Sequence, residues 1–219
     1  TVLFRHDKTF YHEPGLLVRV KDNLPEEQIV RLVEDVANYG VERVGIVLKM
    51  NGFAVENASG DAQTFAKVVQ LIKGKANLPL VLMSSDPRAV EAALSVAGGD
   101  RPLIYAANED NWSAMVELAK KYNAPLAVRS KAAGDLSASA SLAEEVTKAG
   151  VADVILDPGV SDLGAALEAQ TVIRRLAIRK NFRPLGFPTI VFAGDGAESP
   201  LEEVVNASQA ITKYAGLIV

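Results

Sequence analysis

The sequence contains no cysteine, and this absence removes several classes of chemistry. Without thiols the chain forms no disulfide, offers no thiolate nucleophile and cannot ligate zinc or an iron–sulfur cluster through cysteine. Histidine is almost as scarce, because His6 and His12 are the only two and both lie before the first β-rich run. The paired spacing that is typical of histidine metal sites does not occur. We therefore assign no catalytic residue and no metal ligand from the sequence.

An excess of positive charge is also lacking. The chain carries 23 lysines and arginines against 27 aspartates and glutamates, a net charge of −4. Nucleic-acid binding favours a basic surface, so we expect no nucleic-acid partner. No apolar run approaches the roughly 18 to 20 residues of a membrane span, and Thr1–Glu13 is charged and aromatic rather than signal-like. The sequence predicts a cytoplasmic protein with no membrane partner.

What the sequence does contain is a regular alternation of short β-rich runs with helical stretches. This alternation predicts an α/β fold of parallel strands joined by crossover helices, and eight strands are the number that closes a TIM (β/α)8 barrel. The chain stops at the eighth run, which predicts a barrel whose last helix is missing from this chain. The eight runs are Leu16–Val20, Val44–Leu48, Leu80–Met83, Leu103–Ala106, Leu126–Val128, Val154–Leu156, Ile190–Phe192 and Leu217–Val219.

The length and the helix boundaries agree with one barrel domain. The 219 residues, 49% of them hydrophobic, fall within the range of a single barrel. We predict one domain over residues 1–219 with an N-terminal extension at 1–15. Asp86-Pro87 is typical of a helix start, and Ser199-Pro200 followed by Glu202 is a capping box with proline in the first turn.

Polar residues that follow the runs are the candidates for chemistry, because barrels of this kind carry their sites on those loops. Asp86, Asn108 and Asp157 follow the third, fourth and sixth runs. Carboxylates and an amide can bind the paired donors and acceptors of a pterin ring. Pterin-binding barrels place Asp, Asn and Asp at comparable strand ends, and Asp157-Pro158-Gly159 resembles part of their signature. Each residue also has a structural interpretation, as a helix N-cap for Asp86 and Asn108 and as a turn residue for Asp157.

Two further residues at predicted strand ends have alternative interpretations. Arg129 follows the fifth run and could bind an anion or serve as an ion-pair partner. Lys49 follows the second run, together with Asn51, and could form a Schiff base as in aldolase-like barrels. No glycine-rich phosphate loop is found, since Gly194-Asp195-Gly196 has only the character of a turn.

The segment before the first run is unusually aromatic. Leu3–Glu13 contains Phe4, Phe10 and Tyr11 among charged residues. Apolar side chains gathered in one segment are expected to cover a surface or to be covered. We predict either a plug on the amino-terminal face of the barrel or a surface that binds a partner.

The same segment also carries a resemblance to a known family. Its sequence LFRHDKTFYHE resembles the stretch that opens the central barrel of the corrinoid iron–sulfur protein large subunit, the acetyl-CoA decarbonylase/synthase gamma subunit. Other stretches resemble the same family in order and spacing along the whole chain. They are Leu80–Met83 with Asp86-Pro87, Leu103–Ala107, Pro125–Val128, Leu156–Gly159, Ile173–Lys180, Phe182-Arg183, Gly186–Pro188 and Thr212–Ala215.

The resemblance implies a scaffold in a methyl carrier rather than a catalytic domain. Such proteins move a methyl group on cobalt from a methyltetrahydrofolate methyltransferase to acetyl-CoA synthase, in the reductive acetyl-CoA (Wood–Ljungdahl) pathway. The family implies a cobalamin-type corrinoid and a 4Fe-4S cluster in flanking domains that this sequence lacks, with neither bound by this chain alone. It also implies a heterodimer with a small subunit.

A cationic and aromatic cluster is the candidate contact surface of such an assembly. Arginine and aromatic residues are favoured at protein interfaces. The alternative is a solvated helix end whose cations complement the helix dipole. The cluster consists of Arg174, Arg175, Arg179, Phe182 and Arg183.

The sequence therefore supports two alternative functions. One is the scaffold barrel, and the other is a pterin-binding, methyltransferase-type barrel that uses Asp86, Asn108 and Asp157.

Overall fold

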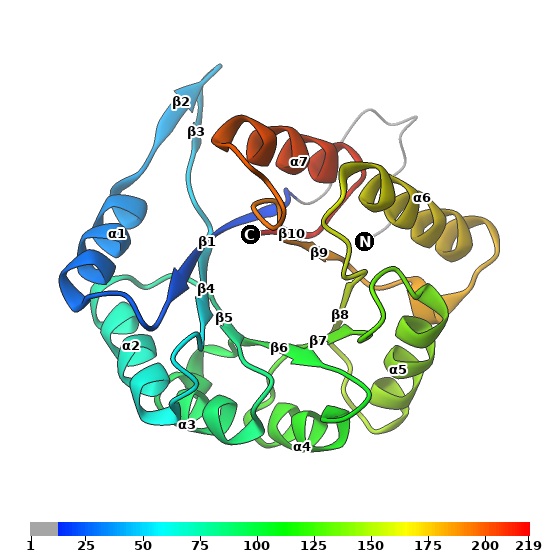
Figure 1. The fold of residues 1–219 in the computed structure, drawn as a ribbon, viewed down its shortest axis with the longest axis horizontal. Helices are drawn as coiled ribbons and strands as arrows, with labels where there is room; N and C mark the ends of the chain where they lie inside the picture. Colours follow the sequence, from blue (N-terminus) through cyan, green and yellow to red (C-terminus); the bar gives the residue numbers. More distant parts are fainter. Residues whose placement is uncertain (1–12) are drawn as a thin grey trace.

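The computed structural model describes residues 13–219, and a barrel of eight parallel strands lies at its centre (Figure 1). The strands are β1 (Gly15–Lys21), β4 (Gly52–Glu56), β5 (Leu80–Met83), β6 (Leu103–Ala107), β7 (Leu126–Arg129), β8 (Val154–Asp157), β9 (Ile190–Val191) and β10 (Leu217–Ile218). They pair in the order β8-β7-β6-β5-β4-β1-β10-β9. A parallel bridge between Leu156 and Thr189 joins β8 to the segment before β9. The ring of strands is therefore nearly closed, as predicted.

Seven α-helices connect these strands within residues 13–219, one between each strand and the next. This count fits a barrel without its eighth helix. Side chains of Asp61, Asp135, Asp162 and Ser199 accept hydrogen bonds from the first-turn N–H groups of four helices, which fixes where those helices begin. The helices are α1 (Glu26–Asn38), α2 (Ala62–Lys75), α3 (Pro87–Ala97), α4 (Trp112–Tyr122), α5 (Leu136–Lys148), α6 (Leu163–Arg179) and α7 (Pro200–Thr212), with short 3-10 turns η2 (Gly98–Asp100) and η3 (Arg183–Leu185).

The prediction for the second barrel strand is wrong. The run Val44–Leu48 does not enter the barrel, and its place between β1 and β5 is taken by β4. Ile46–Leu48 instead forms β3, which pairs antiparallel with β2 (Val41–Arg43). Val44 and Gly45 both have positive φ angles, 50° and 77°, so they form the turn of a hairpin. Val44–Leu48 contains more β-branched residues than Gly52–Glu56, so composition favours it, although Gly52–Glu56 is the buried segment and Ile46–Leu48 is exposed.

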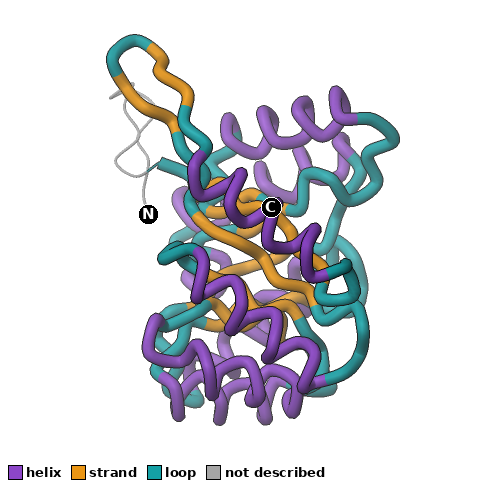
Figure 2. The backbone as a smooth tube through the Cα atoms, turned by 90° about the vertical axis from the view of Figure 1, so that its left-hand side faces the viewer, coloured by secondary structure: helices purple, strands orange, loops and turns teal. Residues whose placement is uncertain are grey.

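The β2–β3 hairpin projects from the body of the molecule (Figure 2). It leaves the chain between α1 and β4, on the amino-terminal side of the barrel, and appears in Figure 1 outside the ring of helices. Val44 at its tip is fully exposed, and Ile46, Val47 and Leu48 are each about half exposed (59%, 55% and 49%). These aliphatic side chains therefore contribute nothing to the core.

The core has two main layers. The larger one lies between the strands and the surrounding helices and includes Phe53, Phe65, Leu82, Ile104 and Leu126, all fully buried. The smaller one consists of inward-facing side chains that fill the barrel, as the alternation of strand residues requires. Its buried members are Leu17, Ala54, Val81, Met83, Leu103, Tyr105, Ala127, Ile190 and Phe192. The barrel is thus packed along its length, and only its ends can hold a ligand.

The predictions for the N-terminal extension are not tested by this structure. Residues 1–12, which contain His6, His12 and the aromatic side chains of the proposed plug, lie outside the described residues. The described chain begins at Glu13 and enters β1 two residues later. Across residues 13–219, none of the helices combines the length and the apolar character that a membrane crossing requires.

Candidate functional site

A pocket of about 380 Å³ lies at the carboxyl ends of the barrel strands, which we call the mouth pocket. This is the end of the fold at which barrel proteins place their sites. Its floor is apolar and aromatic, and its wall is polar and charged. The lining residues are Arg19, Glu56, Asn57, Met83, Ser84, Ser85, Tyr105, Ala106, Asn108, Arg129, Ser130, Lys131, Phe192 and Asp195.

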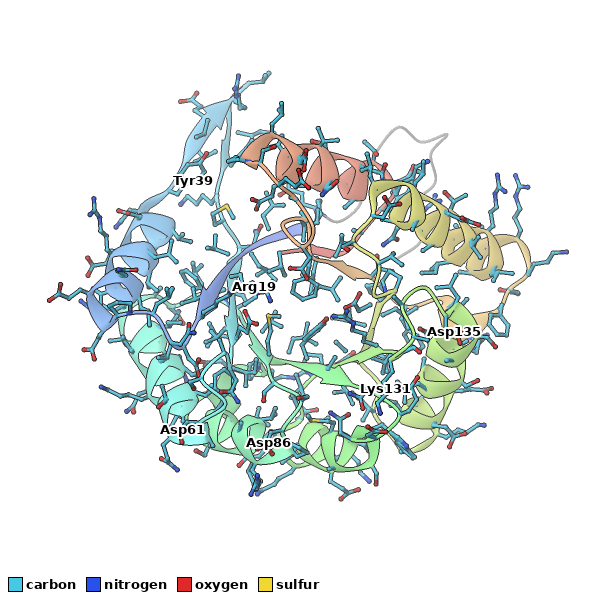
Figure 3. The ribbon with its side chains drawn as sticks, in the orientation of Figure 1. Arg19, Tyr39, Asp61, Asp86, Lys131 and Asp135 are labelled. Atoms are coloured by element: carbon cyan, nitrogen blue, oxygen red, sulfur yellow. The ribbon has the colours of Figure 1, made fainter. Side chains whose placement is uncertain are left out.

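One side of the mouth pocket is organised by Arg19 of β1. Its Nε donates to Glu56 Oε2 (2.8 Å), and its Nη1 donates to Asp195 Oδ1 (2.6 Å). The guanidinium carbon also lies 5.7 Å from the centre of the Phe192 ring. Figure 3 shows Arg19 inside the ring of strands. Because two carboxylates neutralise it, this arginine ties β1 to β4 and to the loop after β9.

The other side is organised by the hydroxyl of Tyr105 on β6. This hydroxyl donates to Asp157 Oδ2 (2.5 Å) and accepts a hydrogen bond from Arg129 Nη1 (2.9 Å). The remaining oxygen of Asp157, Oδ1, accepts from the N–H of Gly159 (2.7 Å). The Tyr105 ring meets Phe192 edge to face, with the ring centres 4.9 Å apart. Three strands, β6, β7 and β8, are therefore linked through a single phenol group.

Burial and charge shift the ionisation of this group of residues. Burial raises the pKa of Asp157 above its usual value, although the bonds from Tyr105 and Gly159 act in the opposite direction. Burial and the neighbouring Asp157 carboxylate also raise the pKa of Tyr105, so the phenol remains a hydrogen-bond donor. Burial alone would lower the pKa of Arg129, but Tyr105 and Asp157 outweigh it and the net shift is upward. Arg129 is therefore a permanent cation at the pocket.

The structure places the three candidate pterin residues in different environments. Asp86 lies among the helices outside the strand ring (Figure 3) and does not line the mouth pocket. Its Oδ1 accepts from the N–H of Arg88 (2.9 Å) at the start of α3. Asn108 lines the pocket, but its Oδ1 accepts from the N–H groups of Asp110 and Asn111 (2.9 and 3.3 Å). Asp157 is 4% exposed and lies below the pocket.

These bonds match the structural interpretation of Asp86 and Asp157, but Asn108 is not the helix N-cap that the sequence suggests, because the N-cap of α4 is Asn111. Asp86 caps α3, Asn108 closes the turn before α4, and Asp157 stabilises the Asp-Pro-Gly turn while it also receives the Tyr105 hydroxyl. A pterin would have to compete with these internal donors. Pterin binding by these residues stays a prediction.

Lys49 and Asn51 lie at the opposite end of the barrel from the mouth pocket, which corrects their predicted position. Both precede β4, and Asn51 Oδ1 accepts from the N–H of Leu16 at the beginning of β1. Lys49 is exposed there. The residues that follow the true second strand are Asn57 and its neighbours, and Asn57 Nδ2 donates to Ser84 Oγ (3.1 Å) across the pocket. The misplacement follows directly from the wrong second strand.

Sequence reasoning also missed the inward-facing residues of the site. Arg19, Tyr105 and Phe192 lie within predicted strands, so a search of the residues that follow each strand does not include them. Period-two alternation could have found Tyr105, because Leu103 and Tyr105 face inward while Ile104 faces the helices. An inward-facing side chain that ends in a polar group and lies near the carboxyl end of a strand is therefore the sequence signal that could have identified these residues as part of the mouth pocket.

The candidate contact cluster lies at the end of α6 and the start of η3. Arg175, Arg179, Phe182 and Arg183 are exposed, whereas Arg174 is partly buried with its guanidinium stacked on the Tyr214 ring (3.7 Å to the centre). Over residues 13–219, Arg175, Arg179 and Arg183 have no recorded acidic partner. Arg175, Arg179 and Arg183 thus form a cationic surface without acidic partners in the described part of the chain, beside the exposed ring of Phe182.

No group of three or more histidine, cysteine, aspartate or glutamate side chains that could hold a metal ion occurs in the part of the chain that the structure describes. The chemistry of the available donors also does not fit an iron–sulfur cluster, since such clusters need thiolates and the chain has no cysteine.

Comparison with known sequences connects the whole chain to one family. A family model described as CO dehydrogenase/acetyl-CoA synthase delta subunit matches residues 1–219. The chain is 38% identical over 219 residues to the corrinoid/iron–sulfur protein large subunit of Moorella thermoacetica, covering 100% of this chain and 48% of that protein. It is 32% identical over 228 aligned residues to the acetyl-CoA decarbonylase/synthase complex subunit gamma of Methanothermobacter thermautotrophicus, covering 100% and 49%. The chain therefore spans about half the length of the curated relatives it matches.

Comparison with solved structures shows the same barrel in distant proteins. Dihydropteroate synthase from Thermus thermophilus, solved in complex with 6HMPPP, matches with a TM-score of 0.63 at 20% identity, covering 94% of this chain and 87% of that one. Yersinia pestis dihydropteroate synthase, solved with a pterine-sulfa conjugate, matches with a TM-score of 0.64 at 16% identity, covering 94% and 86%. At these identities the likeness establishes the fold and nothing about ligands.

Proposed function

Because this chain belongs to the CO dehydrogenase/acetyl-CoA synthase delta subunit family, we propose that it is the scaffold barrel of a corrinoid iron–sulfur methyl carrier. The observation that carries the proposal is the match to the Moorella thermoacetica large subunit over the entire chain. The carrier would move a methyl group from a methyltetrahydrofolate methyltransferase to acetyl-CoA synthase in the reductive acetyl-CoA pathway. We assign the protein to the cytoplasm on the same basis.

The barrel's own contribution would be mechanical rather than catalytic. Its lumen is filled by side chains, and the polar groups at the mouth form internal bonds from β1 to β4 and from β6 to β8. Such cross-strand bonds favour a rigid body, and a rigid body suits a protein that must present a mobile group to successive partners. The corrinoid, which carries the methyl group, and the 4Fe-4S cluster would be held by other domains of the full-length subunit.

We further propose that the contact cluster meets the small subunit of the heterodimer. Arg175, Arg179 and Arg183, which have no acidic partner within residues 13–219, would pair with carboxylates of that subunit, and Phe182, 42% exposed, would be covered by it.

The proposal is tested with the full-length subunit and its small subunit. Arg179→Glu combined with Arg183→Glu should weaken the heterodimer by about tenfold or more, since each change places like charges opposite one another. Arg88→Glu is the matched control, because Arg88 is 89% exposed but belongs to α3, away from the cluster. Affinity is measured by calorimetry, and methyl transfer to acetyl-CoA synthase is followed in parallel. Equal affinities for both variants would place the interface elsewhere, and a wild-type pair that transfers no methyl group would reject the function itself.

A further inference from the structure

The two arginines of the mouth pocket use their hydrogen-bond donors very differently. Arg19 donates from Nε and from Nη1 to two separate carboxylates, Glu56 and Asp195. Because two carboxylates balance its charge, Arg19 has little net charge left to attract an anion. Arg129, on the other side of the pocket, has different partners.

Arg129 keeps most of its donors free. Guanidinium has five N–H donors, and the one hydrogen bond recorded for Arg129 within residues 13–219 runs from Nη1 to the Tyr105 hydroxyl. The nearest carboxylate oxygen, Asp157 Oδ2, is 3.7 Å from Nη1, beyond a good hydrogen bond. The side chain is 44% exposed and lines the pocket. The structure therefore presents a cation whose planar donor group is incompletely used.

The position of this guanidinium is set in advance by its surroundings. The Tyr105 hydroxyl gives its own hydrogen to Asp157, so towards Arg129 it can only accept. Gly159 makes room beside it, because a Cβ there would lie 3.3 Å from Arg129 Nε. A guanidinium that is already oriented loses less conformational freedom when it binds a carboxylate with two parallel hydrogen bonds.

The floor of the same pocket is apolar and aromatic. Phe192, Met83 and the Tyr105 ring line it, and the Phe192 and Tyr105 rings pack edge to face. The volume of about 380 Å³ falls at the small end of the range found for ligand sites. A matching ligand would combine a planar apolar body with a single carboxylate.

We propose that the mouth pocket binds a small aromatic carboxylate, with the carboxylate held by Arg129 and the ring placed against Phe192 and Met83. This inference stands on the pocket alone and does not depend on the proposed role in methyl transfer. It also differs from the pterin hypothesis, because the anchoring group is a cation on β7 and not the carboxylates of Asp86 and Asp157.

The test compares two probes that share a shape and differ in charge. Benzoate should bind the chain saturably in calorimetry, with a dissociation constant on the order of 1 mM, as befits so small a ligand. Benzamide, its neutral counterpart, should bind at least about tenfold more weakly. Acetate, which lacks the ring, should also be weaker.

Variants then locate the site. Arg129→Gln and Arg129→Lys should each weaken benzoate binding by about tenfold, the second because an ammonium cannot make the two-point contact. Arg88→Gln should leave it unchanged. In the wild-type protein, benzoate should shift the NMR signal of the Arg129 Nε–H and leave the signal of the Arg88 Nε–H unchanged. This measurement does not depend on the folding of any variant.

Four results would overturn the proposal. They are the absence of benzoate binding to the wild-type chain, equal binding of benzoate and benzamide, unchanged affinity in the folded Arg129 variants, and benzoate-induced shifts confined to residues outside the mouth pocket.

Discussion

The hydroxyl of Tyr105 on β6 donates a hydrogen bond to the buried carboxylate of Asp157 at the end of β8, 52 residues along the chain. With the Gly159 N–H on its other oxygen, this carboxylate has a donor on each oxygen. The residue most suggestive of a ligand-binding turn is therefore engaged by the chain itself. The same phenol orients Arg129, so one side chain links the packing of the barrel to the mouth arginine that, among the described residues, hydrogen-bonds no carboxylate.

Removing the Tyr105 hydroxyl should destabilise the protein. Tyr105→Phe leaves one oxygen of a buried carboxylate and one N–H of Arg129 without their partner, which costs about 1–3 kcal/mol. The measurement is the free energy of unfolding in urea. Tyr39→Phe serves as the control, because the hydroxyl of the half-exposed Tyr39 makes no side-chain hydrogen bond within residues 13–219, and its loss should cost less than about 0.5 kcal/mol. Equal effects of the two changes would show that the Tyr105–Asp157 bond contributes nothing.

The raised pKa of Asp157 predicts a pH dependence of stability. The folded protein holds this proton more tightly than the unfolded chain, so the contribution of Asp157 to stability is greatest below about pH 4, the pKa in an unfolded chain. It falls as the pH rises through the folded pKa, by at most about 1.4 kcal/mol per pH unit. Asp157→Asn should remove this fall when unfolding is measured from pH 4 to pH 8.

Asp86→Asn is the control for that pH series. The N–H of Arg88 lowers the pKa of Asp86, so its contribution is present above the unfolded pKa and is lost as the pH drops. Replacing Asp86 should therefore flatten the acid side of the stability profile and leave the fall above pH 4 in place. A profile for Asp157→Asn that parallels the wild type would contradict the buried-proton interpretation.

Titration with methyltetrahydrofolate separates the two functions that the sequence suggested. We expect no saturable binding, because the oxygens of Asp86, Asn108 and Asp157 already accept hydrogen bonds and Asp86 lies outside the pocket lining. Fluorescence or calorimetry provides the measurement. Saturable binding that disappears in Asp157→Ala would instead establish the pterin-binding barrel.

The identity of the second barrel strand can be tested at Gly52, the first residue of β4. A Cβ at this position would lie 2.3 Å from the Pro79 carbonyl oxygen, which also accepts the N–H of Phe53 (3.0 Å). Gly52→Ala should therefore cost about 2 kcal/mol or more of unfolding free energy. Gly74→Ala in α2, where a Cβ meets nothing within 4 Å, should instead stabilise by up to about 1 kcal/mol. A fully stable Gly52→Ala variant would reject β4 as the second strand.

The hairpin turn offers a local prediction. Val44 has a φ of 50°, a conformation that a β-branched residue adopts only with strain, and its side chain is fully exposed. Val44→Asn should relieve about 1 kcal/mol, because Asn-Gly is the preferred pair for this turn. Amide exchange at Arg43 and Ile46, the hydrogen-bonded pair next to the turn, should slow by roughly fivefold. Unchanged exchange would mean that the turn does not limit the hairpin.

Much of the barrel could be predicted because its signals are local. The alternation of strands and helices, the N-cap at Ser199 and the cap at Asp86 are set by residues within a few positions of one another, and the structure confirms them apart from the second run. The second strand could not be chosen locally. Val44–Leu48 and Gly52–Glu56 are both β-rich, and only pairing with β1 and β5, which needs a glycine against Pro79, decides between them.

The sequence by itself determined the class of fold, the family and the absence of thiolate chemistry. The tertiary structure decided which polar residues at the mouth are already paired within the protein. The sequence does not distinguish Arg19 from Arg129. In the structure Arg19 donates hydrogen bonds to Glu56 and Asp195, which come from distant parts of the chain, whereas Arg129 donates one to the hydroxyl of Tyr105. Hydrogen-bond partners of this kind lie tens of residues apart, and because they are set by how the strands close into a ring, no local pattern encodes them.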